Sequence, residues 1–234
     1  GNSSTDNDMM LFNHSLGAPI DFAIGKCRSS ASGSGGKWVV WHKDLANDDG
    51  SIYLNESESE SDTNGNNYDE DYSTIGWFQN VTAGAQHQVK IRNVLIYDGS
   101  NTDTVRMVDN NKNFIFYGFA GVEGYSQFGK YTGNGSSDGP FIYTGFRPAF
   151  VLIKNIGASQ DWFLLDNKRE GYNVVDKFLE PNTQNAEATA SSNKADFTAN
   201  GFKLRGSGSV TNQNNTSFVY ACFSESPFKY ANAR

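Results

Sequence analysis

Residues 144–155 read Thr-Gly-Phe-Arg-Pro-Ala-Phe-Val-Leu-Ile-Lys-Asn and are followed, after a gap, by Trp162-Phe-Leu-Leu-Asp-Asn. Residues 15–26 read Ser-Leu-Gly-Ala-Pro-Ile-Asp-Phe-Ala-Ile-Gly-Lys and are followed by Trp38-Val-Val-Trp-His-Lys. The same kinds of block therefore occur twice and in the same order. Repetition of a whole series of apolar blocks indicates that the chain contains two copies of one structural unit.

Each copy closes on an aromatic stretch, at 113–119 in the first copy and at 217–223 in the second. The offset between the copies falls from 129 residues at the matching prolines to 124 at the tryptophans and 104 at Phe114 and Phe218. An offset that shrinks while the order of the blocks is kept means that the first copy has longer loops. Loops vary in this way around an unchanged scaffold.

The composition predicts an all-β protein. The chain of 234 residues contains 24 glycines, and aromatic residues make up 14% of it. Short aromatic and β-branched runs between Gly, Asn and Ser clusters are typical of strands joined by turns. Four-residue apolar runs also fit buried strands better than helices. We predict two tandem antiparallel β-sandwich units with little helix: 1–124, with an acidic insertion at 56–112, and 125–234.

Several classes of function are disfavoured by the sequence. The net charge of −7 makes nucleic acid a poor partner, and no apolar run approaches the length that membrane insertion needs. Two cysteines cannot build a disulfide framework, and the three histidines lack metal-ligand spacing. We therefore expect no catalytic residue, no cofactor and no metal. The first residues lack a start methionine, and we expect them to be the cut edge of a longer chain.

The acidic stretch between Asp44 and Asp71 contains ten acids and no base. Carboxylate and amide oxygens can bind Ca²⁺, but residues 62–69 lack the order of ligands of a twelve-residue calcium loop, which favours a solvated loop. Two such carboxylates could also hydrolyse a glycoside. A hydrolase is the weaker hypothesis, because these acids lie in the least regular segment and the second copy lacks the whole run.

The aromatic residues have two expected roles. Tryptophans in strand-like runs fit a core, and we expect Trp162 to lie in one cluster with Phe150 and Phe218. Trp77 lies instead in the acidic insertion, where an indole could stack on the face of a sugar. The candidate ligand-binding residues are Trp77, Tyr68 and Tyr72.

One long stretch carries a resemblance to a known family. Residues 124–150 read Gly-Tyr-Ser-Gln-Phe-Gly-Lys-Tyr-Thr-Gly-Asn-Gly-Ser-Ser-Asp-Gly-Pro-Phe-Ile-Tyr-Thr-Gly-Phe-Arg-Pro-Ala-Phe. This stretch, with 201–205 and 226–234, resembles tandem concanavalin-like β-sandwich domains of tail-fibre and other virion proteins of tailed bacteriophages, commonly of marine and cyanobacterial phages. The resemblance covers nearly all of 125–234, less of 14–55 and 113–124, and hardly any of 56–112.

The resemblance implies that the two sandwiches are of concanavalin or jelly-roll type. It also implies a non-enzymatic virion protein, located on the tail or another exterior structure. Its expected partners are other virion subunits, with homo-oligomers among them. The first hypothesis is host attachment, in which loops on a rigid scaffold bind a surface glycan or protein receptor. The alternative is a purely structural fibre or decoration element without a ligand. Under either hypothesis we expect the part of the insertion at 56–88 to make the partner contact.

Overall fold

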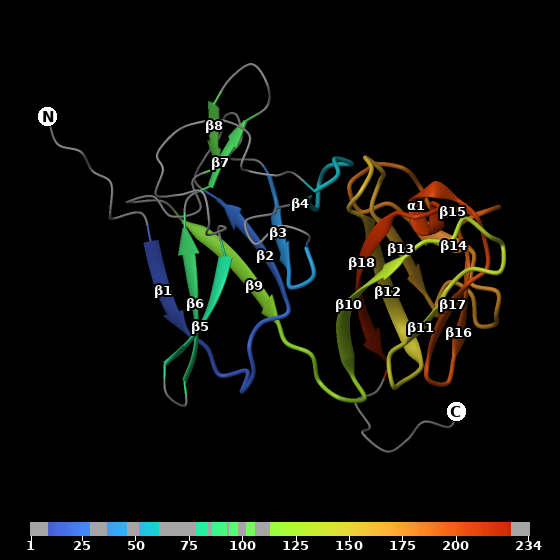
Figure 1. Cartoon of the computed structure of the whole chain (residues 1–234), viewed down its shortest axis with the longest axis horizontal. Helices are drawn as coiled ribbons and strands as arrows, with labels where there is room; N and C mark the ends of the chain where they lie inside the picture. The colour runs from blue at the N-terminus through green and yellow to red at the C-terminus, as the bar shows by residue number, and fades with distance from the viewer. Residues whose placement is uncertain are drawn as a thin grey trace, which may run out of the picture. The chain divides into compact units, whose positions relative to one another are not determined.

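The computed structural model of the chain describes residues 9–28, 37–45, 52–60, 78–83, 86–92, 94–97, 102–105 and 113–225 (Figure 1). These residues form eighteen strands and one four-residue helix, α1 (Ser209–Asn212), which is far too short to span a membrane. Neighbouring strands run antiparallel. The structure thus confirms the all-β sandwich fold with little helix.

The chain divides into two compact units. Unit 1 comprises 1–41, 45–53 and 61–120, and unit 2 comprises 42–44, 54–60 and 121–234. Unit 2 begins four residues before the predicted position, because the turn at its start is closed by a β-bridge between Val122 and Ser126. The two short segments belong to unit 2 through contacts such as that of His42, whose Nε2–H donates to the carbonyl oxygen of Tyr220 at 3.1 Å.

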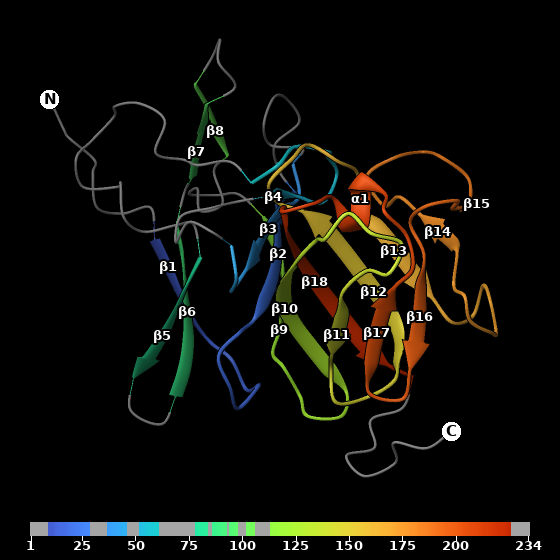
Figure 2. The same cartoon turned by 45° about the vertical axis from the view of Figure 1, so that its right-hand side comes forward.

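Unit 2 is a sandwich of a six-stranded and a three-stranded sheet (Figure 2). The large sheet has the order β10 (Ser126–Thr132), β18 (Ser217–Ser224), β12 (Pro148–Asn155), β13 (Phe163–Asp166), β14 (Lys177–Leu179) and β15 (Ala188–Thr189). The small sheet has the order β11 (Phe141–Tyr143), β17 (Gly201–Leu204) and β16 (Ala195–Thr198). Because side chains alternate between the faces of a strand, each sheet contributes one apolar face to the core. Core residues of unit 2 include Tyr131, Ile142, Val151, Ile153, Phe163, Leu165, Phe197, Phe202, Leu204, Phe218 and Tyr220.

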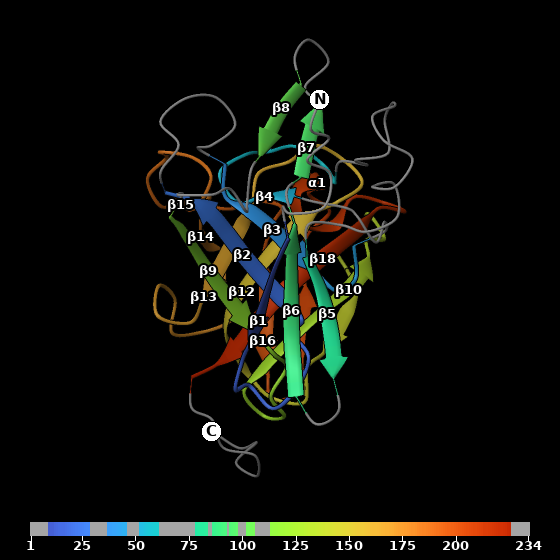
Figure 3. The same ribbon diagram turned by 90° about the vertical axis from the view of Figure 1, so that its left-hand side faces the viewer.

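Unit 1 contains two smaller sheets and a separate hairpin (Figure 3). One sheet has the order β4 (Ile52–Tyr53), β3 (Val39–His42), β2 (Phe22–Cys27) and β9 (Phe114–Phe119). The other has the order β1 (Met9–Asn13), β6 (Gln86–Arg92) and β5 (Phe78–Ala83), and β7 (Val94–Tyr97) pairs with β8 (Thr102–Val105). Apolar side chains from the three-stranded sheet and from the four-stranded sheet meet in one core. Core residues of unit 1 include Ile20, Ala23, Val39, Tyr53, Phe78, Val89 and Ile91.

The two units share one strand order. The series β9-β2-β3-β4 matches β18-β12-β13-β14, and β1-β6-β5 matches β11-β17-β16. The register agrees as well, since Leu11 is opposite Lys90 as Phe141 is opposite Lys203. The hairpin at 78–92 is therefore the counterpart of β16–β17. The sequence predicts that 56–112, with 56–88 inside it, is an insertion without a counterpart in the second copy. For β5 and β6 this prediction is wrong.

A lysine–tryptophan pair recurs in both units. The ammonium of Lys26 lies 4.8 Å from the ring centroid of Trp38, and that of Lys154 lies 5.9 Å from the ring centroid of Trp162. Trp162 is buried, as expected. Its neighbour Phe163, and not Trp162 itself, belongs to the core that contains Phe218. The prediction of one cluster with Trp162, Phe150 and Phe218 is therefore wrong, because Trp162 lies on the other side of the large sheet, beside Lys154.

The side chain of Lys154 is fully buried. Its ammonium donates to the carbonyl oxygen of Ser57 at 2.9 Å and to that of Gln160. Burial lowers the pKa of Lys154 to about 8, and the nearby charges of Asp161 and Glu58 only partly oppose this change. A buried ammonium without its water shell is destabilised relative to the neutral amine, so this lysine links the stability of unit 2 to pH.

We expect the free energy of unfolding of unit 2 to rise by about 1 kcal/mol between pH 8 and pH 9 through Lys154. Between the folded pKa of about 8 and the ordinary value of 10.5, the unfolded chain binds more protons than the folded chain, so stability increases with pH. Urea denaturation at pH 7, 8 and 9 measures this change in the free energy of unfolding. Burial also raises the pKa of the Cys222 thiol from 9.0 to about 12. The unfolded chain therefore loses the thiol proton first, which opposes the rise increasingly as the pH approaches and passes 9.

The matched variant is Lys154→Met, which keeps a long apolar side chain without a titrating amine. Its stability should lack the rise that the unchanged chain shows between pH 8 and pH 9. Equal pH dependence of the two chains would show that Lys154 carries no shifted proton.

Candidate functional site

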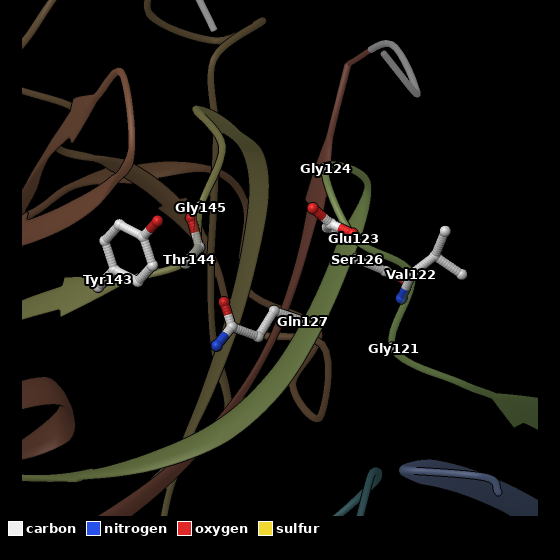
Figure 4. Close-up of a pocket in the computed structure, with 9 residues that line it drawn as sticks. All are labelled: Gly121, Val122, Glu123, Gly124, Ser126, Gln127, Tyr143, Thr144 and Gly145. Atoms are coloured by element: carbon white, nitrogen blue, oxygen red, sulfur yellow. The ribbon is translucent and has the colours of Figure 1, made fainter. Parts of the chain in front are cut away.

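A pocket of about 380 Å³ opens at one end of the unit 2 sandwich (Figure 4). One wall is the turn that precedes β10, the other is the turn that follows β11, and β10 itself supplies a side chain between them. Pockets that hold small ligands have volumes from roughly 300 Å³ upward, so this one can take a ligand the size of a sugar residue. The lining residues are Gly121, Val122, Glu123, Gly124, Ser126, Gln127, Tyr143, Thr144 and Gly145.

The first wall is a tight turn at 121–126. The N–H of Val122 donates to the hydroxyl and to the carbonyl oxygen of Ser126, both at 3.1 Å. Gly124 has a φ of +77°, a conformation that favours glycine. The hydroxyl of Ser224, at the end of β18, donates to the carbonyl oxygen of Gly124 at 3.2 Å. These bonds anchor the turn to the large sheet.

The second wall continues from β11 into a turn at 143–146. The hydroxyl of Thr144 donates to the carbonyl oxygen of Phe146 at 2.6 Å, and the N–H of Thr144 donates to the carbonyl oxygen of Asn200 at 3.0 Å. Gly145 has a φ of +79°, which again favours glycine. Thr144 is buried, whereas the side chain of Tyr143 is 64% exposed. A fixed backbone therefore presents one tyrosine ring at the rim.

Gln127 lies between the two walls, with its amide directed into the pocket (Figure 4). On β10 it shares a face with Tyr131, a core residue, so it occupies a position that would otherwise be apolar. Its Oε1 atom is buried, and no described residue donates a hydrogen bond to it. A buried amide oxygen without a donor costs roughly 1–3 kcal/mol. A ligand hydroxyl or N–H would supply the missing donor.

The pocket combines three kinds of group. Gln127 offers an amide that can both donate and accept, Tyr143 offers an aromatic face with a hydroxyl, and Glu123 is the one carboxylate in the lining. The lining residues that the structure describes include no lysine, arginine, histidine or cysteine. Such a set suits a neutral, hydroxyl-rich ligand, because amides and carboxylates bind hydroxyls while aromatic faces cover C–H surfaces.

The candidate residues from the sequence cannot be compared with this pocket. Trp77, Tyr68 and Tyr72 fall outside the described residues. Of the acidic stretch, the structure describes Asp44, Glu56, Glu58 and Glu60. Among the described residues, no group of three or more His, Cys, Asp or Glu side chains is arranged to hold a metal ion.

Sequence reasoning assigned the stretch with Gln127 and Tyr143 to packing and turns. One signal was available: β10 alternates, and the inward positions 127, 129 and 131 carry Gln, Gly and Tyr, of which only the last belongs to the core. A glutamine at an inward position of a strand indicates either a buried hydrogen-bond network or a ligand. The glycine turns on each side then mark where the backbone can approach that ligand.

The family model for a domain of unknown function, DUF7483, matches residues 2–227. The chain belongs to this family. The match spans both units, so a DUF7483 domain in this chain includes the two sandwiches together and the turn between β9 and β10. No curated protein and no solved structure matches the chain.

Proposed function

We propose that this DUF7483 chain is a non-enzymatic module of a tailed-bacteriophage virion that binds a host-surface glycan in the Gln127 pocket. The observation that carries the proposed binding is the buried Oε1 of Gln127, to which no described residue donates a hydrogen bond, beside the exposed ring of Tyr143. The resemblance of residues 124–150 to tail-fibre and virion domains supports the setting. Six of the nine described residues that line the pocket lie in this stretch.

The lining also supports binding without hydrolysis. Glycosidases use two carboxyl groups, roughly 5 to 9 Å apart, on the two sides of the scissile bond. The pocket has a single carboxylate, that of Glu123, among its nine lining residues. A sugar held by amide, hydroxyl and aromatic contacts would be recognised and released unchanged.

The test is binding of the labelled chain to an array of purified bacterial surface polysaccharides. We expect Tyr143→Ala and Gln127→Leu each to weaken binding of the captured polysaccharide by at least about tenfold, because a lost ring contact or a buried unpaired hydroxyl costs roughly 1–3 kcal/mol. The matched control is Tyr172→Ala, since Tyr172 is 88% exposed and lies outside the pocket. Equal binding by all three variants would place the glycan elsewhere, and no binding to any polysaccharide would exclude the function.

A structural virion element is the second candidate. It is favoured by exposed apolar side chains in unit 1, where Leu11 is 56% and Phe12 is 40% exposed. Such side chains suit contacts between subunits. Particles that incorporate the Tyr143→Ala and Gln127→Leu variants normally and still adsorb to host cells would support this candidate over glycan binding.

A further inference from the structure

The strand that leads into the second wall of the pocket carries two exposed aromatic rings. In β11 the middle residue, Ile142, is buried, whereas Phe141 is 47% and Tyr143 is 64% exposed. Because side chains alternate between the faces of a strand, both rings lie on the outer face of the small sheet. Tyr143 also stands at the rim of the pocket (Figure 4). The outer face therefore adjoins the pocket at this ring.

Each of the two rings extends over a glycine. A Cβ atom placed on Gly201 would stand 3.0 Å from Cζ of Phe141, at the tip of the ring. A Cβ atom placed on Gly145 would stand 3.7 Å from the hydroxyl oxygen of Tyr143. Gly201 is opposite Tyr143 in the pairing of β11 with β17, so the Phe141 ring leans toward the row that contains Tyr143. In the described part of the chain neither ring stacks on another aromatic side chain, and both have a face to offer to a ligand.

The same positions of unit 1 show that the fold itself does not require this arrangement. Asn13 of β1 corresponds to Tyr143, and Gln88 of β6 corresponds to Gly201. The Nε2–H of Gln88 donates to Oδ1 of Asn13 at 2.7 Å, so polar side chains join the two strands there. Unit 2 has a ring and a glycine instead, although exposed rings on an edge strand favour aggregation. The aromatic face thus belongs to the unit that has the pocket, which indicates a role in binding.

The charged side chains beside Phe141 are paired with one another. Lys203 is opposite Phe141, and its Nζ lies 2.8 Å from Oδ1 of Asp138. Nε of Arg205 lies 2.5 Å from Oδ2 of Asp196. Two bases and two acids leave this part of the face without net charge. Such groups can exchange hydrogen bonds with the hydroxyls of a neutral ligand, whereas a charged polymer would meet as much repulsion as attraction.

A chain of sugar residues matches this surface. Phe141 and Tyr143 are two residues apart on one strand, which is a step of roughly 7 Å. Each sugar residue of a chain presents an apolar C–H face within a rim of hydroxyls. Aromatic faces bind the former, and amide, carboxylate and ammonium groups bind the latter. A single sugar in the pocket would leave the Phe141 ring unused, so the surface fits a ligand that is longer than the pocket.

We propose that the site binds a linear, uncharged polysaccharide, of which one sugar residue enters the pocket beside Gln127 and the following residues lie against Tyr143 and then Phe141. This inference rests on the proposed function and adds a second binding position to it. Phe141 is then the residue by which the site distinguishes a chain from a single sugar.

The test is calorimetric titration with the polysaccharide that the chain captures from the array, cut into oligosaccharides of increasing length, and with its constituent monosaccharides. For the unchanged chain we expect the affinity to rise at least about tenfold from the monosaccharide to the longer oligosaccharides. Phe141→Leu should bind the longer oligosaccharides at least about fivefold more weakly and the monosaccharide equally well, because it loses the ring but not the pocket. The fold accepts leucine here, since Leu11 stands at the equivalent place in unit 1.

Phe141→Tyr is the matched control, because it retains the ring and should bind every length as the unchanged chain does. Gln127→Leu should instead weaken binding of every length, the monosaccharide included. An affinity that does not rise with length, or that rises equally in Phe141→Leu, would overturn this inference and leave the proposed function standing, as would capture of charged polysaccharides alone. Capture of no polysaccharide would exclude the proposed function and this inference with it.

Nuclear magnetic resonance of the isotope-labelled, unchanged chain gives a readout that needs no variant. The side-chain amide signals of Gln127 should shift with the monosaccharide and with the oligosaccharides. The ring signals of Phe141 should shift only with oligosaccharides that are long enough to reach the ring. Phe141 signals that stay fixed at saturation with the longest oligosaccharide would show that the ligand does not extend along β11 and would contradict the inference.

Discussion

Replacing Trp162 with alanine is expected to lower the free energy of unfolding of unit 2 by about 3–5 kcal/mol. The indole is 2% exposed and stands 5.9 Å from the ammonium of Lys154. Its removal leaves a cavity beside a buried charge and ends the cation–π contact. Urea denaturation, followed through the exchange protection of amides in β12 and β18, reports the loss for unit 2 itself.

The same substitution has a second expected consequence. Water that enters the cavity would hydrate the ammonium, so the pKa of Lys154 should move back toward 10.5. The rise in stability between pH 8 and pH 9 should then shrink along with the overall stability. Trp162→Phe is the matched control, because it retains an aromatic face and most of the volume. A Trp162→Ala chain that unfolds at the same urea concentration as the unchanged chain would show that the indole is not a packing element.

The sequence was sufficient for the repeat because each unit has the same lysine, tryptophan and aromatic closing strand. It was insufficient for the small sheet of unit 1, where only one short pattern survives. Val89-Lys-Ile-Arg92 and Phe202-Lys-Leu-Arg205 share an alternation of apolar and basic residues. In both units the lysine is opposite a residue of the first strand of the small sheet, Leu11 of β1 or Phe141 of β11. A pattern of four residues, with loops of different length on each side, is too short to align the two units by sequence. The strand pairing was needed to show that these residues correspond.

The pocket could not be predicted for a different reason. Its walls come from two stretches of chain, 121–127 and 143–145, that belong to different sheets. β10 reaches its place by pairing with β18, about ninety residues later in the chain, and β11 by pairing with β17, about sixty residues later. Periodicity shows that Gln127 points inward, but only these long-range pairings show that Tyr143 stands beside it. The aromatic residues in 56–88 stand out by composition alone, and composition contains no such geometry.

Replacing Asn212 with leucine is expected to destabilise unit 2 by about 3 kcal/mol or more. Asn212 is fully buried in α1. Its Nδ2 donates to the carbonyl oxygens of Ser136 and Gly206, both at 2.8 Å, and to Oδ1 of Asn134 at 3.0 Å. Its Oδ1 accepts the backbone N–H of Asn134 at 2.8 Å. Leucine has a similar size but would leave these groups without partners, and each buried unpaired group costs roughly 1–3 kcal/mol.

The variant Asn212→Asp keeps the accepting oxygen of the side chain and removes the donating NH₂ group. A carboxylate can still accept the N–H of Asn134, but it would face three oxygen atoms to which the asparagine donates. Near neutral pH the loss of stability should therefore be at least as large as with leucine. It should diminish as the pH falls and the carboxyl group gains a proton that it can donate, because the folded state then binds that proton more strongly than the unfolded chain. Asn214→Ala, at an exposed position two residues after α1, should change the stability by less than about 0.5 kcal/mol. If Asn212→Leu and Asn214→Ala unfold at the same urea concentration, the bonds of Asn212 do not hold the loop between β10 and β11 in place.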